Sequence, residues 1–260
     1  MMLRIATFVW LGLTLAFIAA PTAIAVIVAF SAAEVVKFPP DGFTVKWFSI
    51  AWRQELFWRA ALISFALALA AMAIAVPAGV AGALAIRRAS RQVRHLLELV
   101  FMSPLLVPAI VLSLAILVGS VMLGASDAPL RLWAAHTVIV LPYVVRTTLA
   151  SLAGMPAGVE EAAATQGANP WQVFRHITLP LVMPGVLAGA AFAFIISFDN
   201  VSVSLFLVNQ KTPTLPLAIM NYVEYNFDPS VAAISTTMVI LSLAIAWLVE
   251  RMVGLRRILG

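Results

Sequence analysis

Six long apolar runs constrain this chain more than any other feature of its sequence. An α-helix needs roughly 20 consecutive apolar residues to cross the hydrocarbon core of a bilayer. Since 63% of the residues are hydrophobic and only 10% are charged, these runs are too apolar for the surface of a soluble domain. The sequence therefore predicts an all-α, polytopic membrane protein. Its transmembrane helices are expected at about 5–30, 60–86, 96–123, 132–152, 180–208 and 230–249.

The first run has some features of a secretory signal peptide. Arg4 precedes it, and Ala23-Ile24-Ala25 resembles a cleavage site. The run is longer than the apolar part of a signal peptide and continues past that site, so we predict an uncleaved first span. The following loop, 31–58, is rich in aromatic residues, which favour the lipid interface.

A polar stretch at 155–178, here called the elbow, lies between the fourth and fifth runs and has the parts of two short helices. Gly158 is placed to cap the first helix, with Glu160 and Glu161 in its first turn, where carboxylates favour the positive end of the helix dipole. Three alanines continue this helix. Gly167 can then end it in a left-handed conformation.

The second elbow helix begins with Asn169-Pro170, a capping residue followed by proline at the first helical position. Its apolar side is expected to comprise Trp171, Val173, Phe174 and Ile177. A membrane protein that builds a capped elbow with aromatic residues between two spans is expected to present it to a partner.

The spacing of the elbow residues resembles the EAA loop of permease subunits in ATP-binding-cassette importers. That pattern is E-A-A, three residues, G, nine residues, then I-x-L-P. It is met here by Glu161, Ala162, Ala163, Gly167, Ile177, Leu179 and Pro180. The resemblance implies a cytoplasmic coupling loop, in which Glu160, Asn169 and Pro170 also take part. It further implies that the first elbow helix docks on a separate ATPase subunit.

The same resemblance implies a set of partners and a location. The partners would be two ATPase subunits, a second permease subunit (a paralogue rather than an identical copy), an extracytoplasmic solute-binding protein and the lipid bilayer. ATP and Mg would be bound by the ATPase subunits and no cofactor by this chain. The expected location is the bacterial inner membrane.

The sequence itself offers no catalytic, metal or nucleic-acid site. A phosphate-binding P-loop needs glycine immediately before its lysine, yet none of the three lysines has one: Lys37, Lys46 and Lys211. The chain contains no cysteine, and no metal-binding spacing joins the three histidines, His95, His136 and His176. Basic residues cluster at the ends of apolar runs rather than on a soluble face, which argues against nucleic acid.

The distribution of Lys and Arg predicts the orientation. With both termini and the elbow in the cytoplasm, ten basic residues face the cytoplasm, namely Arg4, Arg87, Arg88, Arg91, Arg94, Arg146, Arg175, Arg251, Arg256 and Arg257. Six face outward, namely Lys37, Lys46, Arg53, Arg59, Arg131 and Lys211. The excess on the cytoplasmic side agrees with the positive-inside rule.

Looser motifs over about 130–245 resemble the spermidine/putrescine-type branch of these permeases. They include Ser197-Phe198-Asp199, Thr214-Leu215-Pro216-Leu217 and Asp228-Pro229, together with the segment from His136 to Arg146. This resemblance implies a polyamine such as putrescine or spermidine. Asn200 stands where that branch is expected to carry an acidic residue, so opines, phosphonates, thiamine and iron remain open as substrates.

Asp199 and Asn200 lie within an otherwise apolar stretch, 188–208. An ionisable group inside a membrane is costly and is therefore a candidate for the substrate path. If the fifth span starts at Pro180, however, Asp199 falls near its outer end, where the carboxylate could be solvated at the interface. Both interpretations stay open at this point.

The sequence thus favours one transmembrane domain, 1–260, which forms the translocation path of an ATP-driven importer without being an enzyme. The main alternative is a self-sufficient secondary transporter or channel, in which the elbow is only solvated. A membrane-embedded enzyme is a more distant alternative.

Overall fold

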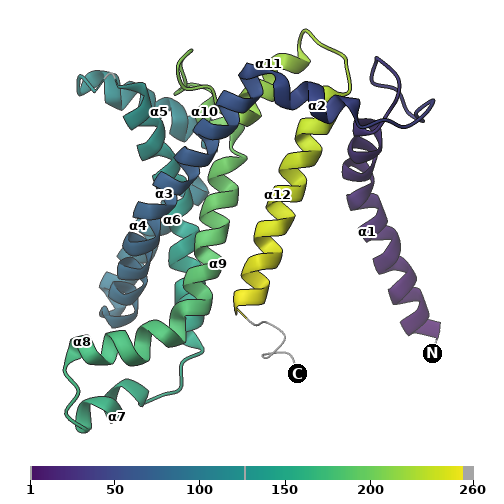
Figure 1. The fold of residues 1–260 in the computed structure, drawn as a ribbon. Helices are drawn as coiled ribbons and strands as arrows, with labels where there is room; N and C mark the ends of the chain where they lie inside the picture. The colour runs from purple at the N-terminus through teal and green to yellow at the C-terminus, as the bar shows by residue number, and fades with distance from the viewer. Residues whose placement is uncertain (1, 126, 254–260) are drawn as a thin grey trace. The chain divides into compact units, whose positions relative to one another are not determined.

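A computed structural model describes residues 2–125 and 127–253, and helices dominate this part of the chain (Figure 1). The predicted all-α, polytopic fold is confirmed. The elements are α1 (Met2–Ala29), α2 (Lys46–Arg53), α3 (Glu55–Arg88), α4 (Arg91–Leu106), α5 (Ala109–Met122), α6 (Ala128–Ala153), α7 (Val159–Thr165), α8 (Pro170–Val173), the π-helix η1 (Phe174–Thr178), α9 (Leu179–Phe198), α10 (Val201–Ser204), α11 (Leu215–Val223) and α12 (Ser230–Val253).

The chain divides into two compact units. The described part of the first unit is 2–58 with 218–243. That of the second is 59–125 and 127–217 with 244–253. The single domain expected over 1–260 stays a prediction.

In the first unit, Trp47 anchors the interfacial helix α2. Its ring is buried against Ala29 and Ala233, and its indole Nε1 donates a hydrogen bond to the carbonyl of Ser31 over 2.9 Å. Large apolar side chains of α1, by contrast, are exposed, with Phe17 at 83%. A helix this apolar with so little covered surface is suited to contact lipid.

Among the described residues, five helices are long and apolar enough to cross a membrane alone. The third span, predicted over 96–123 and interrupted by Pro104 and Pro108, is divided into α4 and α5, which meet at an angle of 103°. The cause is local. Val107 precedes Pro108 and has extended backbone angles (φ −94°, ψ 130°), since the proline ring disfavours helical geometry in the residue before it. Counting the bent pair as one span gives the predicted six.

The fifth span also differs from its predicted bounds of 180–208. It begins at Pro170, because α8, η1 and α9 follow one another without a break, and it ends at Phe198. The π-helical turn ends just before Leu179-Pro180, so the missing proline N–H falls where the hydrogen-bond register is already shifted. The second elbow helix is therefore the start of a span rather than a separate element.

Helices α6 and α9 pack side by side in the second unit (Figure 1). Two glycines of α9 allow this close approach. A Cβ atom at Gly185 would lie 2.4 Å from the carbonyl oxygen of Thr147, and one at Gly189 would lie 2.9 Å from the Cα atom of Val144. Small residues at such contacts let membrane helices associate through backbone packing. This pair fixes α9, whose two ends carry both groups of predicted site residues.

Candidate functional site

The first elbow helix, α7, begins and ends as the sequence predicts. Gly158 is its N-cap with a left-handed φ of +76°, and Glu160 and Glu161 lie in its first turn. Gly167 follows the helix with φ +90°, a conformation that residues with a Cβ atom rarely adopt. The glycines thus set the direction in which the chain enters and leaves α7.

The second elbow helix starts with a complete capping box. Asn169 Oδ1 accepts a hydrogen bond from the backbone N–H of Gln172 (2.9 Å), and Gln172 Oε1 accepts one from the N–H of Asn169 (2.8 Å). Asn169 and Pro170 therefore act as predicted. The contribution of Gln172 was missed, although a glutamine three residues after an N-cap is a visible signal.

Glu160 ties the elbow to the membrane-spanning helices. Its Oε2 lies 2.7 Å from Arg87 Nη2, at the end of α3, and its Oε1 accepts hydrogen bonds from Arg87 Nη1 and from the hydroxyl of Thr178. Thr178 is fully buried in η1. One carboxylate therefore joins α7 to α3 and to the start of the fifth span, and we call Arg87, Glu160 and Thr178 the clamp.

The clamp holds Glu160 in its ionised form. Burial opposes the charge, but the Thr178 hydroxyl and the Arg87 guanidinium outweigh that effect and keep the pKa of the Glu160 carboxyl below its ordinary value. The side chains of Arg87 and Glu160 are 34% and 23% exposed. An ion pair at this depth contributes on the order of 1 kcal/mol to holding the elbow.

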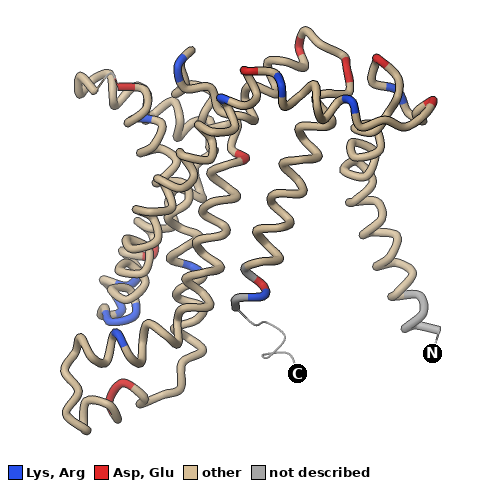
Figure 2. The backbone as a smooth tube through the Cα atoms, in the orientation of Figure 1, with Lys and Arg blue, Asp and Glu red and all other residues tan. Residues whose placement is uncertain are grey.

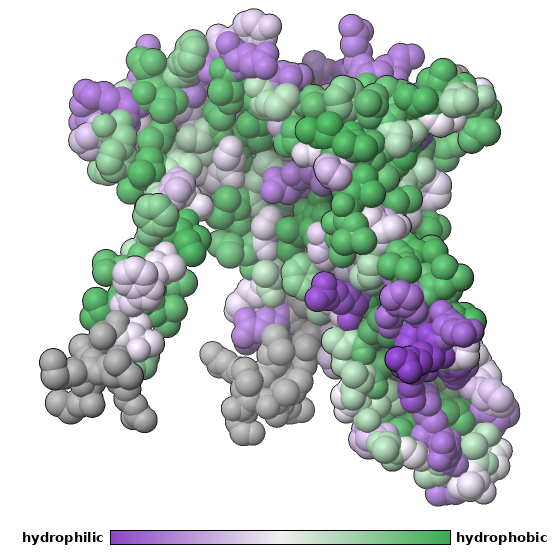
Figure 3. Space-filling view, turned by 180° about the vertical axis from the view of Figure 1, so that it is seen from behind, coloured by the Kyte–Doolittle hydropathy of each residue, from purple (hydrophilic) through white to green (hydrophobic). Residues whose placement is uncertain are grey.

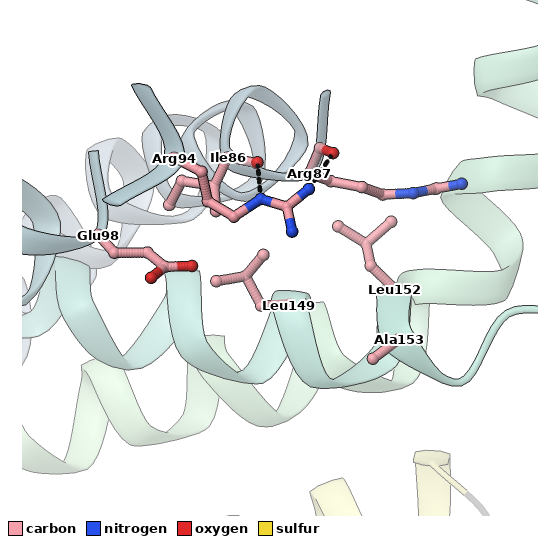
Figure 4. Close-up of a pocket in the computed structure, with 7 residues that line it drawn as sticks. All are labelled: Ile86, Arg87, Arg94, Glu98, Leu149, Leu152 and Ala153. Atoms are coloured by element: carbon pink, nitrogen blue, oxygen red, sulfur yellow. Dashed lines mark hydrogen bonds between the residues drawn. The ribbon is translucent and has the colours of Figure 1, made fainter. Parts of the chain in front are cut away.

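Arg94 positions the end of α3 from which Arg87 reaches the elbow. Its Nε and Nη2 atoms donate hydrogen bonds to the carbonyls of Ile86 (3.2 Å) and Arg87 (3.1 Å), so the guanidinium caps the C-terminus of α3. Figure 4 shows the Arg94 side chain over a pocket of about 270 Å³, whereas Arg87 extends away from it. The pocket is lined by Ile86, Arg87, Arg94, Glu98, Leu149, Leu152 and Ala153. We interpret this pocket as a structural gap beneath the Arg94 cap of α3 rather than as a binding site.

The other face of the elbow is uncovered. Trp171 is 63% exposed, with its ring centroid 5.6 Å from that of Phe174. A hollow of about 460 Å³ lies between the two elbow helices and is lined by Ala163, Gln166, Gly167, Ala168, Gln172, Val173, His176 and Ile177. Of the predicted coupling residues, those exposed are Glu161, Ala162, Gly167, Asn169, Pro170 and Pro180, and those half-buried are Glu160, Ala163, Ile177 and Leu179.

Charge is gathered at this end of the second unit. Figure 2 shows the basic residues of the α3–α4 turn next to the elbow, and Figure 3 shows a hydrophilic patch in the same region, below a mostly apolar surface. The α3–α4 turn carries four arginines, Arg87, Arg88, Arg91 and Arg94. The charged surface at this end is therefore suited to contact water, and the apolar surface beyond it is suited to contact lipid.

Asp199 and Asn200 lie at the opposite end of α9 from the elbow, so the structure does not bring the two groups of predicted residues together. α9 has 20 residues, which separates its ends by roughly 30 Å. Asp199 is exposed, and within the described part of the chain its carboxylate has no hydrogen-bond or ion-pair partner. Asn200 caps α10 by accepting a hydrogen bond at Oδ1 from the N–H of Val203 (2.8 Å).

The helices and the elbow together define the membrane subunit of an ATP-binding-cassette importer. Residues 75–256 match the sequence profile of the family described as "Binding-protein-dependent transport system inner membrane component". The chain belongs to this family, and within it to the spermidine/putrescine branch. The predicted class and the inner-membrane, multi-pass location are thereby confirmed.

Several relatives cover most of this chain. It is 32% identical over 203 residues to the spermidine/putrescine transport system permease protein PotC of Escherichia coli K12, covering 78% of this chain and 77% of the relative. Identity to PotC of Haemophilus influenzae is 34% over 208 residues, 78% and 79% of the two chains. Identity to the putative 2-aminoethylphosphonate transport system permease protein PhnV of Salmonella typhimurium is 30% over 219 residues, 82% and 80% of the two chains.

Solved structures share the fold. A chain of a bacterial ABC transporter that imports the acidic polysaccharide alginate superimposes with a TM-score of 0.73 at 19% identity, covering 99% of this chain and 96% of that one. A chain of the MetNI methionine ABC transporter gives 0.60 at 22% identity, covering 76% and 93%.

The clamp predicts how the elbow responds to pH. Because the pKa of Glu160 is lowered on folding, its contribution is complete above the ordinary glutamate value of 4.5 and is lost as pH falls through the lowered value. A nitroxide label at Ala164, in the full chain in nanodiscs, should be equally immobile from about pH 8 to about pH 5 and should loosen only below the ordinary glutamate pKa.

Glu160→Gln should loosen this label already at neutral pH, because the ion pair with Arg87 is gone. Glu161→Gln is the matched control, since Glu161 is exposed and should leave the label unchanged. An immobile label in Glu160→Gln at neutral pH would contradict the clamp.

Proposed function

We propose that this chain forms part of the translocation path for a small solute that carries a primary ammonium group, with a polyamine favoured. We further propose that it is coupled to a separate ATPase through α7. The observation that carries the proposed coupling is the structure of the elbow. Glu161 is exposed there, while the adjacent Glu160 is bonded to Arg87 on α3 and to Thr178 in η1.

The solute class is supported by the names of the relatives. One kind is named for spermidine and putrescine and the other for 2-aminoethylphosphonate, all of which are primary amines. Asp199 adds a carboxylate without a partner in the described part of the chain, close to a break between two helices. An unpaired carboxylate at the end of a span is suited to attract a cation.

The partners proposed are two ATPase subunits, which would bind ATP and Mg, a second permease subunit and an extracytoplasmic solute-binding protein. The last kind of partner occurs in a structural relative, an alginate transporter solved in complex with a periplasmic protein. This chain would itself be non-catalytic, as befits relatives that are named permease proteins.

We propose that the elbow and both termini face the cytoplasm. The excess of basic residues on that side supports this orientation, and so does the charged surface of the α3–α4 turn beside the elbow (Figure 2). Asp199 would then lie toward the outer face, where the solute arrives from its binding protein.

The clamp suggests how ATPase movement reaches the membrane. A pull on α7 would be transmitted through Glu160 to Arg87 at the end of α3 and to Thr178 at the start of the fifth span. Because α9 is packed closely on α6, α6 and α9 would shift together rather than bend separately.

Gly167→Ala tests the coupling. The new Cβ meets no atom within 4 Å, so its effect comes from the left-handed backbone, which costs roughly 1–2 kcal/mol with a side chain. Solute transported per ATP hydrolysed should fall severalfold in the reconstituted transporter. Gly154→Ala is the matched control, since Gly154 has φ −83° and a Cβ there makes ordinary contacts.

Glu161→Lys should reduce the same ratio without displacing the clamp, because it opposes the helix dipole and any basic group on the ATPase. Normal coupling in both Gly167→Ala and Glu161→Lys, with the ATPase still bound, would refute the docking role of α7.

Asp199→Asn tests the solute. It keeps the shape and removes the charge, so the KM for putrescine uptake should rise by about tenfold or more if the carboxylate faces the cation in a partly dry path. Asp127→Asn is the matched control, because Asp127 is also exposed and its side chain makes no capping bond. An unchanged KM in an assembled Asp199→Asn transporter would show that Asp199 is merely solvated at the interface.

A further inference from the structure

A buried histidine lies at the break between α9 and α10. His136, on α6, is fully buried, and its ring bonds to serines on either side of the break. Its Nδ1 is 2.9 Å from the hydroxyl of Ser197, in the last turn of α9, and its Nε2 is 3.2 Å from the hydroxyl of Ser204, in α10. Asp199 and Asn200 lie between these two serines in the chain.

The hydrogen bonds fix the roles of the two ring nitrogens in a neutral imidazole. The Ser204 hydroxyl donates its proton to the carbonyl of Asn200 (2.9 Å), so it can only accept from the ring, and Nε2 must carry the hydrogen. Nδ1 is then the acceptor and receives the hydroxyl proton of Ser197. The ring therefore satisfies both of its polar atoms within the core, as buried polar groups require.

A second contact holds α10 from another side. The hydroxyl of Ser113, on α5, is buried and donates to the carbonyl of Val203 over 2.7 Å. Asn200 caps the same short helix. The chain segment after Asp199 is thus restrained by α5, by α6 and by its own cap, whereas the Asp199 carboxylate itself has no partner among the described residues.

We propose that His136 is a positioning residue that fixes the geometry of the α9–α10 break and thereby aims the Asp199 carboxylate at the solute. This inference rests on the proposed function for the role of Asp199. A leucine would fill the same space at a lower cost in free energy, because a buried polar ring is unfavourable unless all its polar atoms are hydrogen-bonded. What the imidazole adds is one donor and one acceptor directed to the two sides of the break.

The first test measures geometry without any solute. A nitroxide label at Leu205, the exposed residue that ends α10, is placed in the assembled transporter in nanodiscs. His136→Leu should increase the mobility of this label severalfold while leaving a second label, at exposed Leu181 near the start of α9, unchanged. Thr148→Val is the matched control, because Thr148 is also buried on α6 and its hydroxyl has no hydrogen-bond partner within 2–125 and 127–253.

Two conservative variants separate the two bonds. His136→Gln can keep the donor toward Ser204, and His136→Asn can keep the acceptor toward Ser197. Since Ser204 belongs to α10, the Gln variant should restrain the Leu205 label more than the Asn variant does. Equal mobility of that label in wild type and His136→Leu would overturn the proposal.

The second test measures uptake. In His136→Leu the KM for putrescine should rise about tenfold at normal membrane abundance, and in an Asp199→Asn background the same change should add nothing further. If His136→Leu lowers only the membrane abundance and leaves the KM unchanged, His136 is a purely structural core residue and the proposal fails. Equal effects of His136→Leu on the KM with and without Asp199→Asn would also overturn the proposal.

The two failures are distinguishable. If Asp199→Asn alone leaves the KM for putrescine unchanged, the proposed solute site fails, and with it the aiming of Asp199. The label at Leu205 then still decides whether His136 holds the break.

Discussion

The bonding of the Glu160 carboxylate to Arg87 and Thr178 is the interaction on which the position of the elbow depends. The carboxylate takes hydrogen bonds from Arg87 on α3 and from Thr178 in η1, so a helix outside the membrane is joined to two elements that continue into spans. Without this contact α7 would keep its packing on α8 and η1 but would lose its ion pair with the end of α3. The neighbouring Glu161 is exposed, as its proposed contact with an ATPase requires.

The fifth span connects the elbow with the proposed solute end. It starts in the elbow itself, since α8, η1 and α9 are continuous, and it stops at Phe198, beside Asp199. Between the ends, Gly185 and Gly189 let α6 approach α9 closely, and α6 supplies the histidine that holds the break. The α6–α9 pair therefore connects the elbow, which the ATPase would move, to Asp199, which the solute would meet.

Sequence reasoning succeeded where the cause is local. Caps and left-handed glycines act within a few residues, so Gly158, Gly167, Asn169 and Pro170 could be assigned from the sequence alone. It failed where distant residues decide. Arg87 is far from Glu160 in the chain, and the two serines around His136 meet it only after α6 and α9 pack. The interruption of the third span at Pro108 is visible in the sequence, but the bend of 103° between α4 and α5 is not, because an apolar count carries no angle.

A direct test of the account is to ask what α7 touches in the working transporter. A photo-crosslinking residue at exposed Ala164 would be introduced into the chain in cells that carry its native partners. The account predicts a crosslink to an ATPase subunit, increased by trapping the ATP-bound state. Crosslinks only to an extracytoplasmic binding protein, or none to an ATPase while transport is normal, would contradict both the orientation and the coupling role of the elbow.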